Sequence, residues 1–296
     1  MPFRMLNRKF GYELAFVEMI NCRSISHKSR ITHAMLSSNR KDRPLGIQLL
    51  GVEEKFVLKA VEIIKKYEFD ILDFNAACPA KKVVRRGEGS GLLKEPKKLA
   101  KLLKLVVKNS QKPVTVKIRA GWDKDSVNAR EVALYAQDSG VSGLFIHGRT
   151  RMQEYGGNVD YEIIRDVKNA LDIPVIASGD LFSPELIKKM FDETGCDAVA
   201  IARGALGNPW IFKQTEKYLK DGEPIKNPDI DEIVSVMHKH LDASIDFYGE
   251  RNGVMLFRKF FAWYTKGFRQ IRHLREKSSR AKTENEMKLL VSACLK

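Results

Sequence analysis

Residues 69–79 of this chain read FDILDFNAACP, and the change in character along this segment decides the fold. Residues 69–74 are mostly apolar, which is typical of a short strand buried on both faces of a sheet. Asn75, Cys78 and Pro79 then follow, and an amide, a thiol and a proline suit a loop over a cavity better than a core. Cys78 is therefore a candidate reactive group, and the segment predicts an enzyme.

The same strand pattern recurs along the chain, and longer amphipathic segments separate its copies. Strands are predicted at 14–19, 45–49, 71–75, 114–118, 143–147, 174–178 and 198–202. Strands that alternate with helices form a parallel sheet. We expect a (β/α)8 TIM barrel rather than an open doubly wound sheet, because the region up to about residue 219 nearly fills one barrel.

The two ends of the chain complete the predicted organisation. Residues 1–11 read as the first barrel helix with no strand before it, so we expect the first strand to be missing or the start codon to have been assigned late. Helix-breaking residues at 221–228 mark a linker, and 230–248, 254–271 and 284–294 are helical in period. The sequence predicts a catalytic barrel at 1–221 and a small basic all-α domain at 222–296.

Composition and charge narrow the function. The 296 residues are 44% hydrophobic and 30% charged, with no apolar run of membrane length and no signal peptide, so we expect a cytoplasmic protein away from membranes. The net charge of +15 predicts a polyanionic partner such as nucleic acid. The stretch 251–282 holds ten Lys or Arg and one acidic residue. The four cysteines and six histidines form no ligand pattern, so no metal is expected.

Polar side chains gather where the predicted strands end. They are Gln48, Asp73, Asn75, Lys117, Arg119, His147, Arg149, Ser178, Asp180 and Arg203, with Gly179 and Gly204 among them. In a barrel these strand ends surround one mouth, where barrel enzymes keep their active sites. Glycines before a helix let backbone N–H groups hold a phosphate, so 179–180 and 203–204 predict a phosphorylated cofactor. Lys117 and Gln48 would contact the ring of that cofactor.

The glycine-rich segment 87–93, GEGSGLL, invites comparison with dinucleotide-binding loops. It neither follows a predicted strand nor opens a βαβ unit, so it lacks the context that such loops need. We expect it instead to form a mobile lid beside Cys78.

Together these segments resemble the tRNA-dihydrouridine synthase family. The matching segments are 75–79, 83–93, 114–122, 146–150, 178–180 and 202–204. The resemblance covers most of the chain, and it implies an oxidoreductase whose residues 1–221 bind FMN and whose residues 222–296 bind tRNA. It also implies NADPH as the electron donor. We expect the protein to be a monomer.

The resemblance further implies the reaction and the residues that perform it. Reduced FMN would deliver hydride to C6 of a uridine in tRNA, and Cys78 would give a proton to C5, which yields 5,6-dihydrouridine. The implied FMN contacts are Gln48, Lys117, His147, Gly179, Asp180, Arg203 and Gly204. Asn75, Arg119 and Arg149 would bind the uracil, after the base has been flipped out of its stack. In the basic stretch 251–282, the expected tRNA contacts are Arg269, Arg272 and Arg275.

One residue departs from the family pattern, and two other functions stay open. Ala77 stands where a glycine usually precedes the cysteine, and a positive φ there would cost about 1 kcal/mol. The first alternative is another FMN-dependent barrel oxidoreductase that acts on a free pyrimidine, although a small substrate needs no basic helical surface. The second is a non-catalytic tRNA-binding relative, which the missing first strand motivates.

Overall fold

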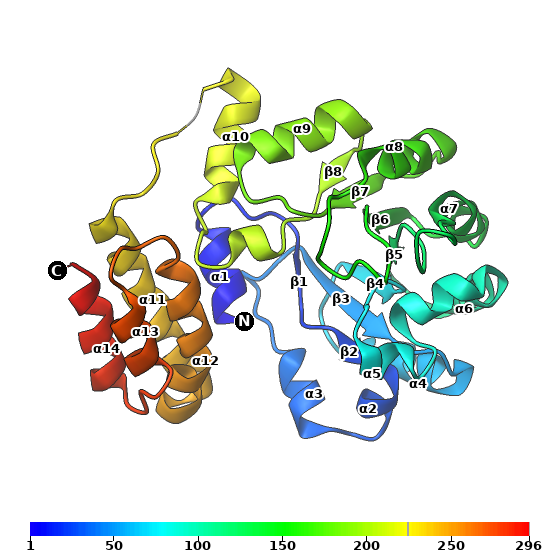
Figure 1. Ribbon diagram of the computed structural model, residues 1–296. Helices are drawn as coiled ribbons and strands as arrows, with labels where there is room; N and C mark the ends of the chain where they lie inside the picture. Colours follow the sequence, from blue (N-terminus) through cyan, green and yellow to red (C-terminus); the bar gives the residue numbers. More distant parts are fainter. Residues whose placement is uncertain (224, 296) are drawn as a thin grey trace. The chain divides into compact units, whose positions relative to one another are not determined.

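The chain folds into two compact units, which the computed structural model describes over residues 1–223 and 225–295 (Figure 1). We call Glu13–Leu181 together with Leu186–Ile201 the barrel unit. The helical unit consists of Met1–Tyr12, Phe182–Glu185 and Ala202–Lys296.

Every strand of the barrel unit pairs in parallel with its neighbours. The strands are β1 (Ala15–Phe16), β2 (Ile20–Asn21), β3 (Leu45–Leu50), β4 (Ile71–Asn75), β5 (Val114–Arg119), β6 (Gly143–His147), β7 (Val175–Ser178) and β8 (Ala198–Val199). Their order is β1-β3-β4-β5-β6-β7-β8, with β2 also beside β3. From β3 onwards each strand therefore lies next to its successor, as in a (β/α)8 barrel, whereas a doubly wound sheet reverses its order. The predicted fold class is confirmed.

The strand predicted at 14–19 is interrupted. Both β1 and β2 pair with β3, but Phe16 lies opposite Gly46 and Ile20 lies opposite Leu49. The chain thus takes one more residue than β3 to cover the same distance, which is the arrangement of a β-bulge. The bulge divides the predicted strand into two short pieces.

Amphipathic helices follow the strands on the outer side of the sheet (Figure 1). They are α2 (Cys22–Ser26), α3 (Arg30–Met35), α4 (Glu54–Ile64), α5 (Lys81–Val84), α6 (Pro96–Asn109), α7 (Ala129–Asp138), α8 (Tyr161–Ala170) and α9 (Pro184–Thr194). A 3₁₀ helix, η1 (Gly89–Lys94), lies between α5 and α6. In α4 the residues Val57, Ala60, Val61 and Ile64 are buried, and this three-four spacing is what covers a sheet.

Two aromatic rings pack together within the sheet of the barrel unit. The Phe16 ring lies so close to β3 that a Cβ atom at Gly46 would come within 2.2 Å of it. The same ring meets Phe145 of β6 edge to face, with 5.6 Å between the ring centroids. Because only glycine leaves this room, Gly46 allows an aromatic side chain to pack between strands.

The helical unit contains the basic stretch and most of the C-terminal helices. Its elements are α1 (Pro2–Arg8), η2 (Arg203–Ala205), α10 (Ile211–Asp221), α11 (Ile230–Tyr248), α12 (Glu250–Tyr264), α13 (Arg272–Ser278), α14 (Glu284–Ser292) and η3 (Ala293–Leu295). The prediction of one helix over 254–271 is wrong, because α12 ends at Tyr264. Gly267 has a φ of +91° and Gln270 a φ of +52°, and such left-handed residues end a helix.

The compact units do not follow the predicted boundary at 221/222. Residues 1–12 and 202–221 group with the C-terminal helices. Leu6 belongs to their apolar core, and the Phe3 ring stacks on Phe260 with centroids 5.4 Å apart. The first helix thus uses its apolar side to complete the core of the helical unit.

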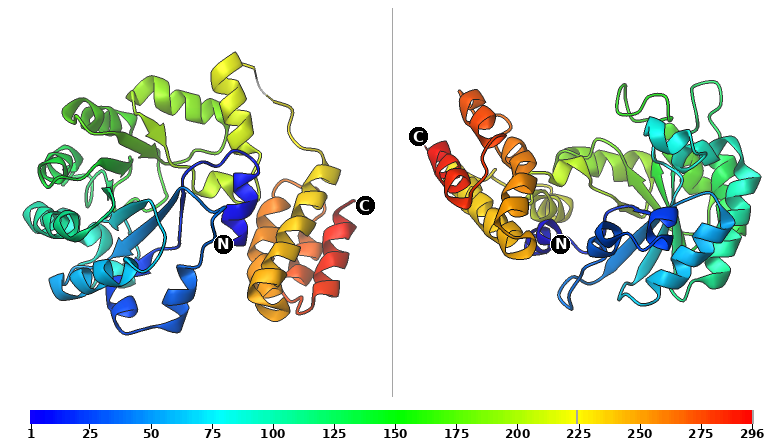
Figure 2. Two further views of the ribbon diagram at one scale, coloured as in Figure 1. Left: turned by 180° about the vertical axis from the view of Figure 1, so that it is seen from behind. Right: turned by 90° about the horizontal axis from the view of Figure 1, so that it is seen from below.

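The aromatic residues of the basic stretch mainly form core. Phe257 and Phe261 of α12 are fully buried, while Trp263 is partly buried. Helices α11, α12 and α14 pack side by side around them (Figure 2). Among the helices described here, none combines the length and apolar character that a membrane span requires.

Candidate active site

Strand register places the polar strand ends of the barrel unit side by side. Gln48 lies opposite Asp73, and Asn75 opposite Lys117. Farther along the sheet, His147 lies between Arg119 and Ser178. Parallel pairing thus assembles groups that are up to 130 residues apart in the sequence, since residues 48 and 178 stand at the two ends of this row.

A chain of hydrogen bonds links the first of these side chains. Asp73 is buried and accepts hydrogen bonds from Gln48 Nε2 and Thr115 Oγ1, each at 2.7 Å. Asn75 Nδ2 donates to Gln48 Oε1 at 2.8 Å. These bonds fix both amide groups, because the donor and acceptor ends of each have separate partners.

The loop that carries Cys78 is held from several sides. Asn75 Oδ1 accepts the backbone N–H groups of Ala77 and Cys78 at 3.0 and 2.8 Å. Arg119 Nε donates to the Ala77 carbonyl at 2.9 Å. Ala77 is not among the residues with positive φ, so its replacement of glycine brings no backbone strain.

The segment predicted to be a mobile lid is instead packed against this loop. Ser90 is fully buried, and both its backbone N–H and its hydroxyl donate to the Cys78 carbonyl, at 3.1 and 2.9 Å. Gly89 has a φ of +58°, and a Cβ there would come within 2.7 Å of that carbonyl. The segment therefore clamps Cys78, and the prediction of a lid is wrong.

Cys78 is the partly exposed cysteine of this chain, whereas Cys22, Cys196 and Cys294 are buried. Burial, assisted by Glu88, raises the pKa of the Cys22 thiol to about 12. Burial also raises the pKa of Cys196, and it brings that of Cys294 to about 11. A buried thiol with a raised pKa is chemically inert, so Cys78 is the cysteine best placed to meet a substrate.

Burial shifts the pKa values of the charged pair at the centre of the row. It raises the pKa of Asp73 to about 6 against the lowering effect of its hydrogen bonds. It lowers the pKa of Lys117 to about 8, which Asp73 partly opposes. Lys117 Nζ donates to Ser178 Oγ at 3.0 Å, and Ser178 donates onward to the Ile146 carbonyl. The Lys117 ammonium group and the buried Asp73 carboxylate therefore influence each other electrostatically at the centre of this row.

His147 is neutral in this site. Burial, together with Arg119, Lys117 and Arg149, lowers its pKa to about 3. Arg149 Nη1 lies 3.4 Å from His147 Nε2, and a guanidinium group can only donate. Nε2 is therefore the acceptor, and the proton of the neutral ring resides on Nδ1.

The guanidinium groups of Arg119 and Arg149 bind protein loops. Arg119 Nη1 donates to the carbonyls of Thr150 and Glu154 at 3.0 and 2.8 Å. Arg149 is fully buried, and it donates to Gly156, Gly157 and the Asp180 carboxylate. Both side chains hold the segment after β6 in place.

The turn after β7 needs its glycine. Gly179 has a φ of +128°, and a Cβ there would lie 2.7 Å from Val159 and 2.9 Å from His147. Asp180 follows with a φ of +50°. The turn thus brings bare backbone up to the imidazole ring and aims Asp180 at Arg149.

The other predicted contacts belong to the helical unit. Arg203 and Gly204 form part of η2. Arg269 and Arg272 are exposed, and Arg272 pairs with Glu276 at 3.1 Å. Arg275 is partly buried, and its Nε donates to Thr265 Oγ1 at 3.0 Å. A groove of about 530 Å³ is lined by Phe268, Gln270, Ile271, Arg272, Arg275, Glu276 and Ser279.

Comparison with known proteins identifies the family. A family model described as dihydrouridine synthase matches residues 1–296. The chain belongs to the dihydrouridine synthase family. The resemblance noted in the sequence is confirmed.

Individual dihydrouridine synthase relatives agree with the family model. The chain is 38% identical to tRNA-dihydrouridine synthase B of Pseudomonas aeruginosa over 263 residues, which cover 89% of this chain and 79% of that protein. It is 38% identical to a probable tRNA-dihydrouridine synthase of Rickettsia conorii, over 90% of this chain and 81% of the relative.

Solved structures support the fold of this dihydrouridine synthase family member. Histamine dehydrogenase from Rhizobium sp. 4-9 matches with a TM-score of 0.54 at 13% identity, over 81% of this chain and 46% of that one. An amine oxidase from Pseudomonas geniculata N1 matches with a TM-score of 0.56 at 12% identity, over 82% and 47%. This chain spans about half of each structure.

Sequence reasoning placed most of the barrel-unit residues at one edge of the sheet, Asp73 among them, but it missed two participants. Asp73 stood at a predicted strand end, and its position two residues before Asn75 already indicated a shared face. Thr115 and Glu88 carried no such signal, because their roles come from partners far away in the sequence. No group of three potential metal-ligating side chains lies in the part of the chain that the structure describes.

The neutral state of His147 has a measurable effect on stability. As pH falls from 6.5 towards 3, the unfolded chain takes up a proton at this imidazole that the folded site excludes. The free energy of unfolding should therefore decrease with falling pH more steeply in the wild type than in His147→Gln. Urea unfolding across this pH range measures the difference, and the other titrating groups cancel between the two proteins. Parallel curves would show that the folded site does not exclude the proton.

Proposed function

We propose that this protein reduces the C5–C6 double bond of a uridine in tRNA to 5,6-dihydrouridine, with FMN as cofactor, NADPH as electron donor and Cys78 as general acid. The relatives are named tRNA-dihydrouridine synthases. The observation that carries the proposal is the reachable Cys78 thiol on a loop fixed by Asn75, Arg119 and Ser90. We also propose a cytoplasmic location, because that is where the tRNA substrate would be met.

The donors around Lys117 suit a flavin ring. The Lys117 ammonium has three N–H groups, and Ser178 takes one of them. The remaining donors fit the carbonyl and ring nitrogen at the pyrimidine edge of a flavin, where negative charge collects on reduction. Gln48 and His147 would complete the ring contacts. Within the barrel unit, the backbone N–H groups of Gly179 and Asp180 would hold the phosphate.

The residues of this chain supply the proton and the geometry. FMN, when bound and reduced, would supply the hydride that C6 of the uracil accepts. C5 then holds an electron pair and forms a bond to the proton that Cys78 Sγ releases, and the thiolate recovers a proton from solvent. Asn75, Arg119 and Arg149 line the uracil site as fixed walls, since each already holds a loop.

The target uridine lies in a folded RNA, and its base has to leave the stack to be reduced. Exposed cations of the helical unit offer contacts to the RNA backbone. Arg269 and Arg272 are suited to this role, because their side chains are exposed. Arg275 is the third proposed contact, and it lines the groove together with Arg272. The protein performs these steps as a monomer in our proposal.

The general-acid role predicts a selective loss in Cys78→Ala. Turnover should fall by about a hundredfold to ten-thousandfold, the usual contribution of a positioned acid. Flavin absorbance and tRNA affinity should persist, because the thiol holds neither. The measurement is dihydrouridine formed per enzyme from unmodified tRNA and NADPH. The matched control is Cys196→Ala, which removes a buried thiol and should stay active. Full activity in Cys78→Ala would refute the assignment.

The RNA contacts predict a change in salt dependence. The double variant Arg269→Gln/Arg272→Gln should bind tRNA more weakly, and the slope of log affinity against log salt should fall by about one per lost phosphate contact. Filter binding across a salt series measures the slope. The control is Lys55→Gln/Lys59→Gln, which removes two exposed charges from α4. If both double variants weakened tRNA binding equally, the loss would reflect net charge alone, and the assignment of Arg269 and Arg272 as phosphate contacts would be refuted.

A further inference from the structure

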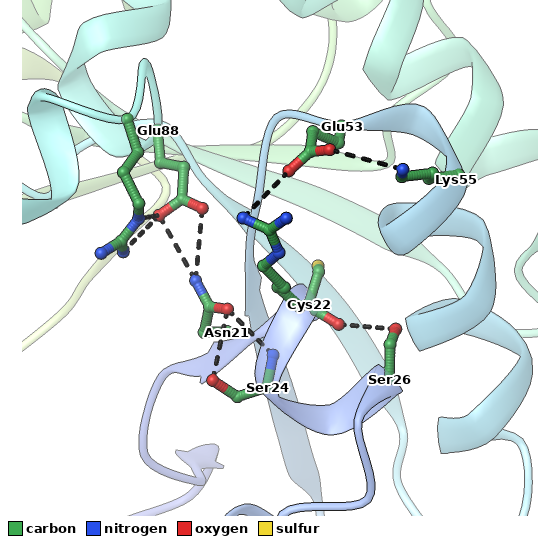
Figure 3. Close-up of polar contacts among 9 residues, drawn as sticks. Asn21, Cys22, Ser24, Ser26, Glu53, Lys55 and Glu88 are labelled. Carbon is green, nitrogen blue, oxygen red and sulfur yellow. Dashed lines mark hydrogen bonds and ion pairs between the residues drawn. The ribbon is translucent and has the colours of Figure 1, made fainter.

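A buried carboxylate lies in the segment that clamps Cys78, and the reaction described above does not use it. The side chain of Glu88 is only 8% exposed. Its carboxylate accepts hydrogen bonds from Arg86, at 3.0 Å from Nε and 2.6 Å from Nη2. Asn21 Nδ2 lies 3.3 Å from both carboxylate oxygens (Figure 3).

Asn21 ties this carboxylate to the sheet. It is the last residue of β2, which pairs with β3. Its Oδ1 accepts the backbone N–H of Ser24 at 3.1 Å and so caps α2. Because the cap fixes the oxygen end of the amide, the nitrogen end is directed at Glu88 (Figure 3).

The residues that follow Glu88 transmit this anchorage to Cys78. Gly89 approaches the Cys78 carbonyl and Cβ so closely that an added Cβ would lie 2.7 and 3.0 Å from them. Ser90 then donates two hydrogen bonds to the same carbonyl. The path from the sheet to the thiol-bearing residue therefore runs through Asn21, Glu88 and Ser90.

Stability alone gives little reason to retain a charge here. Burying the Glu88 carboxylate costs desolvation energy, which the attraction to the partly exposed Arg86 often fails to recover. What a buried, multiply bonded carboxylate does provide is a single defined geometry.

We propose that Glu88 is a positioning residue that sets the location of the Cys78 thiol through the segment 88–90. The inference rests on the proposed function, in which Cys78 is the general acid. Glu88 touches neither substrate nor cofactor in this scheme. Its contribution to turnover exists only while there is a thiol at position 78 to position.

The chain offers a matched control in the same region. Glu53 pairs with Arg23 at 3.8 Å and with Lys55 at 4.0 Å (Figure 3). Its side chain is 45% exposed, and its pairs do not lead to Cys78. Glu53→Gln thus removes the same charge by the same substitution without loosening the clamp.

The test is a double-mutant cycle with the flavin-loaded protein. Glu88→Gln should lower kcat on unmodified tRNA by about tenfold to a hundredfold, the effect of a small misplacement, with KM and flavin absorbance unchanged. In the Cys78→Ala background the same substitution should have no further effect. Glu53→Gln should match the wild type in both backgrounds. An equal loss from Glu88→Gln with and without the thiol would overturn the inference.

A second readout does not depend on turnover. The rate of alkylation of Cys78 by iodoacetamide, followed by mass spectrometry, should rise several-fold in Glu88→Gln and also in Asn21→Asp. Asn21→Asp keeps the helix cap but loses the donor to Glu88. The two variants change the local charge in opposite directions, so opposite changes in rate would indicate a charge effect and contradict positioning. A wild type without dihydrouridine activity would instead refute the proposed function, and unchanged alkylation rates in both variants would refute only the role of Glu88.

Discussion

The two-ended hydrogen bonding of the Asn75 side chain is the constraint on which the rest of the site depends. Its oxygen accepts the N–H groups of Ala77 and Cys78, and its nitrogen donates to Gln48. An amide with both ends occupied has one orientation. The loop that bears the thiol and the row of polar groups along the strands are therefore fixed by the same residue, at the end of a strand that the barrel holds rigid.

The charged and polar groups at the neighbouring strand ends are also held in fixed positions, so the site is preorganised. Asp73 holds Gln48 in place through a hydrogen bond. Lys117 belongs to β5, the strand beside β4, and burial lowers its pKa to about 8. His147 stays neutral beside Arg149. Fixed dipoles and charges at strand ends need no rearrangement when charge develops on a ligand, and this is the main way in which a folded site promotes a reaction.

The sequence predicted the sheet well because strands buried on both faces leave continuous apolar runs, and their alternation placed Asp73 with Asn75. The sequence-based prediction failed where contacts between distant residues determine the structure. The break between α12 and α13 depends on left-handed Gly267 and Gln270, and the joining of Leu6 to the helical core depends on packing. Residues 87–93 read as a lid because the partner of Glu88 is Asn21, 67 residues away.

The central claim is that a thiol held in one position delivers the proton to C5. The most direct measurement is the reaction in D2O with unlabelled NADPH, followed by NMR of the dihydrouridine released from the tRNA. A fixed donor places a single deuterium at C5 on one face of the ring, whatever label C6 receives through the exchangeable N–H of reduced flavin. Deuterium distributed over both faces of C5 would mean that solvent, and not a positioned Cys78, provides the proton.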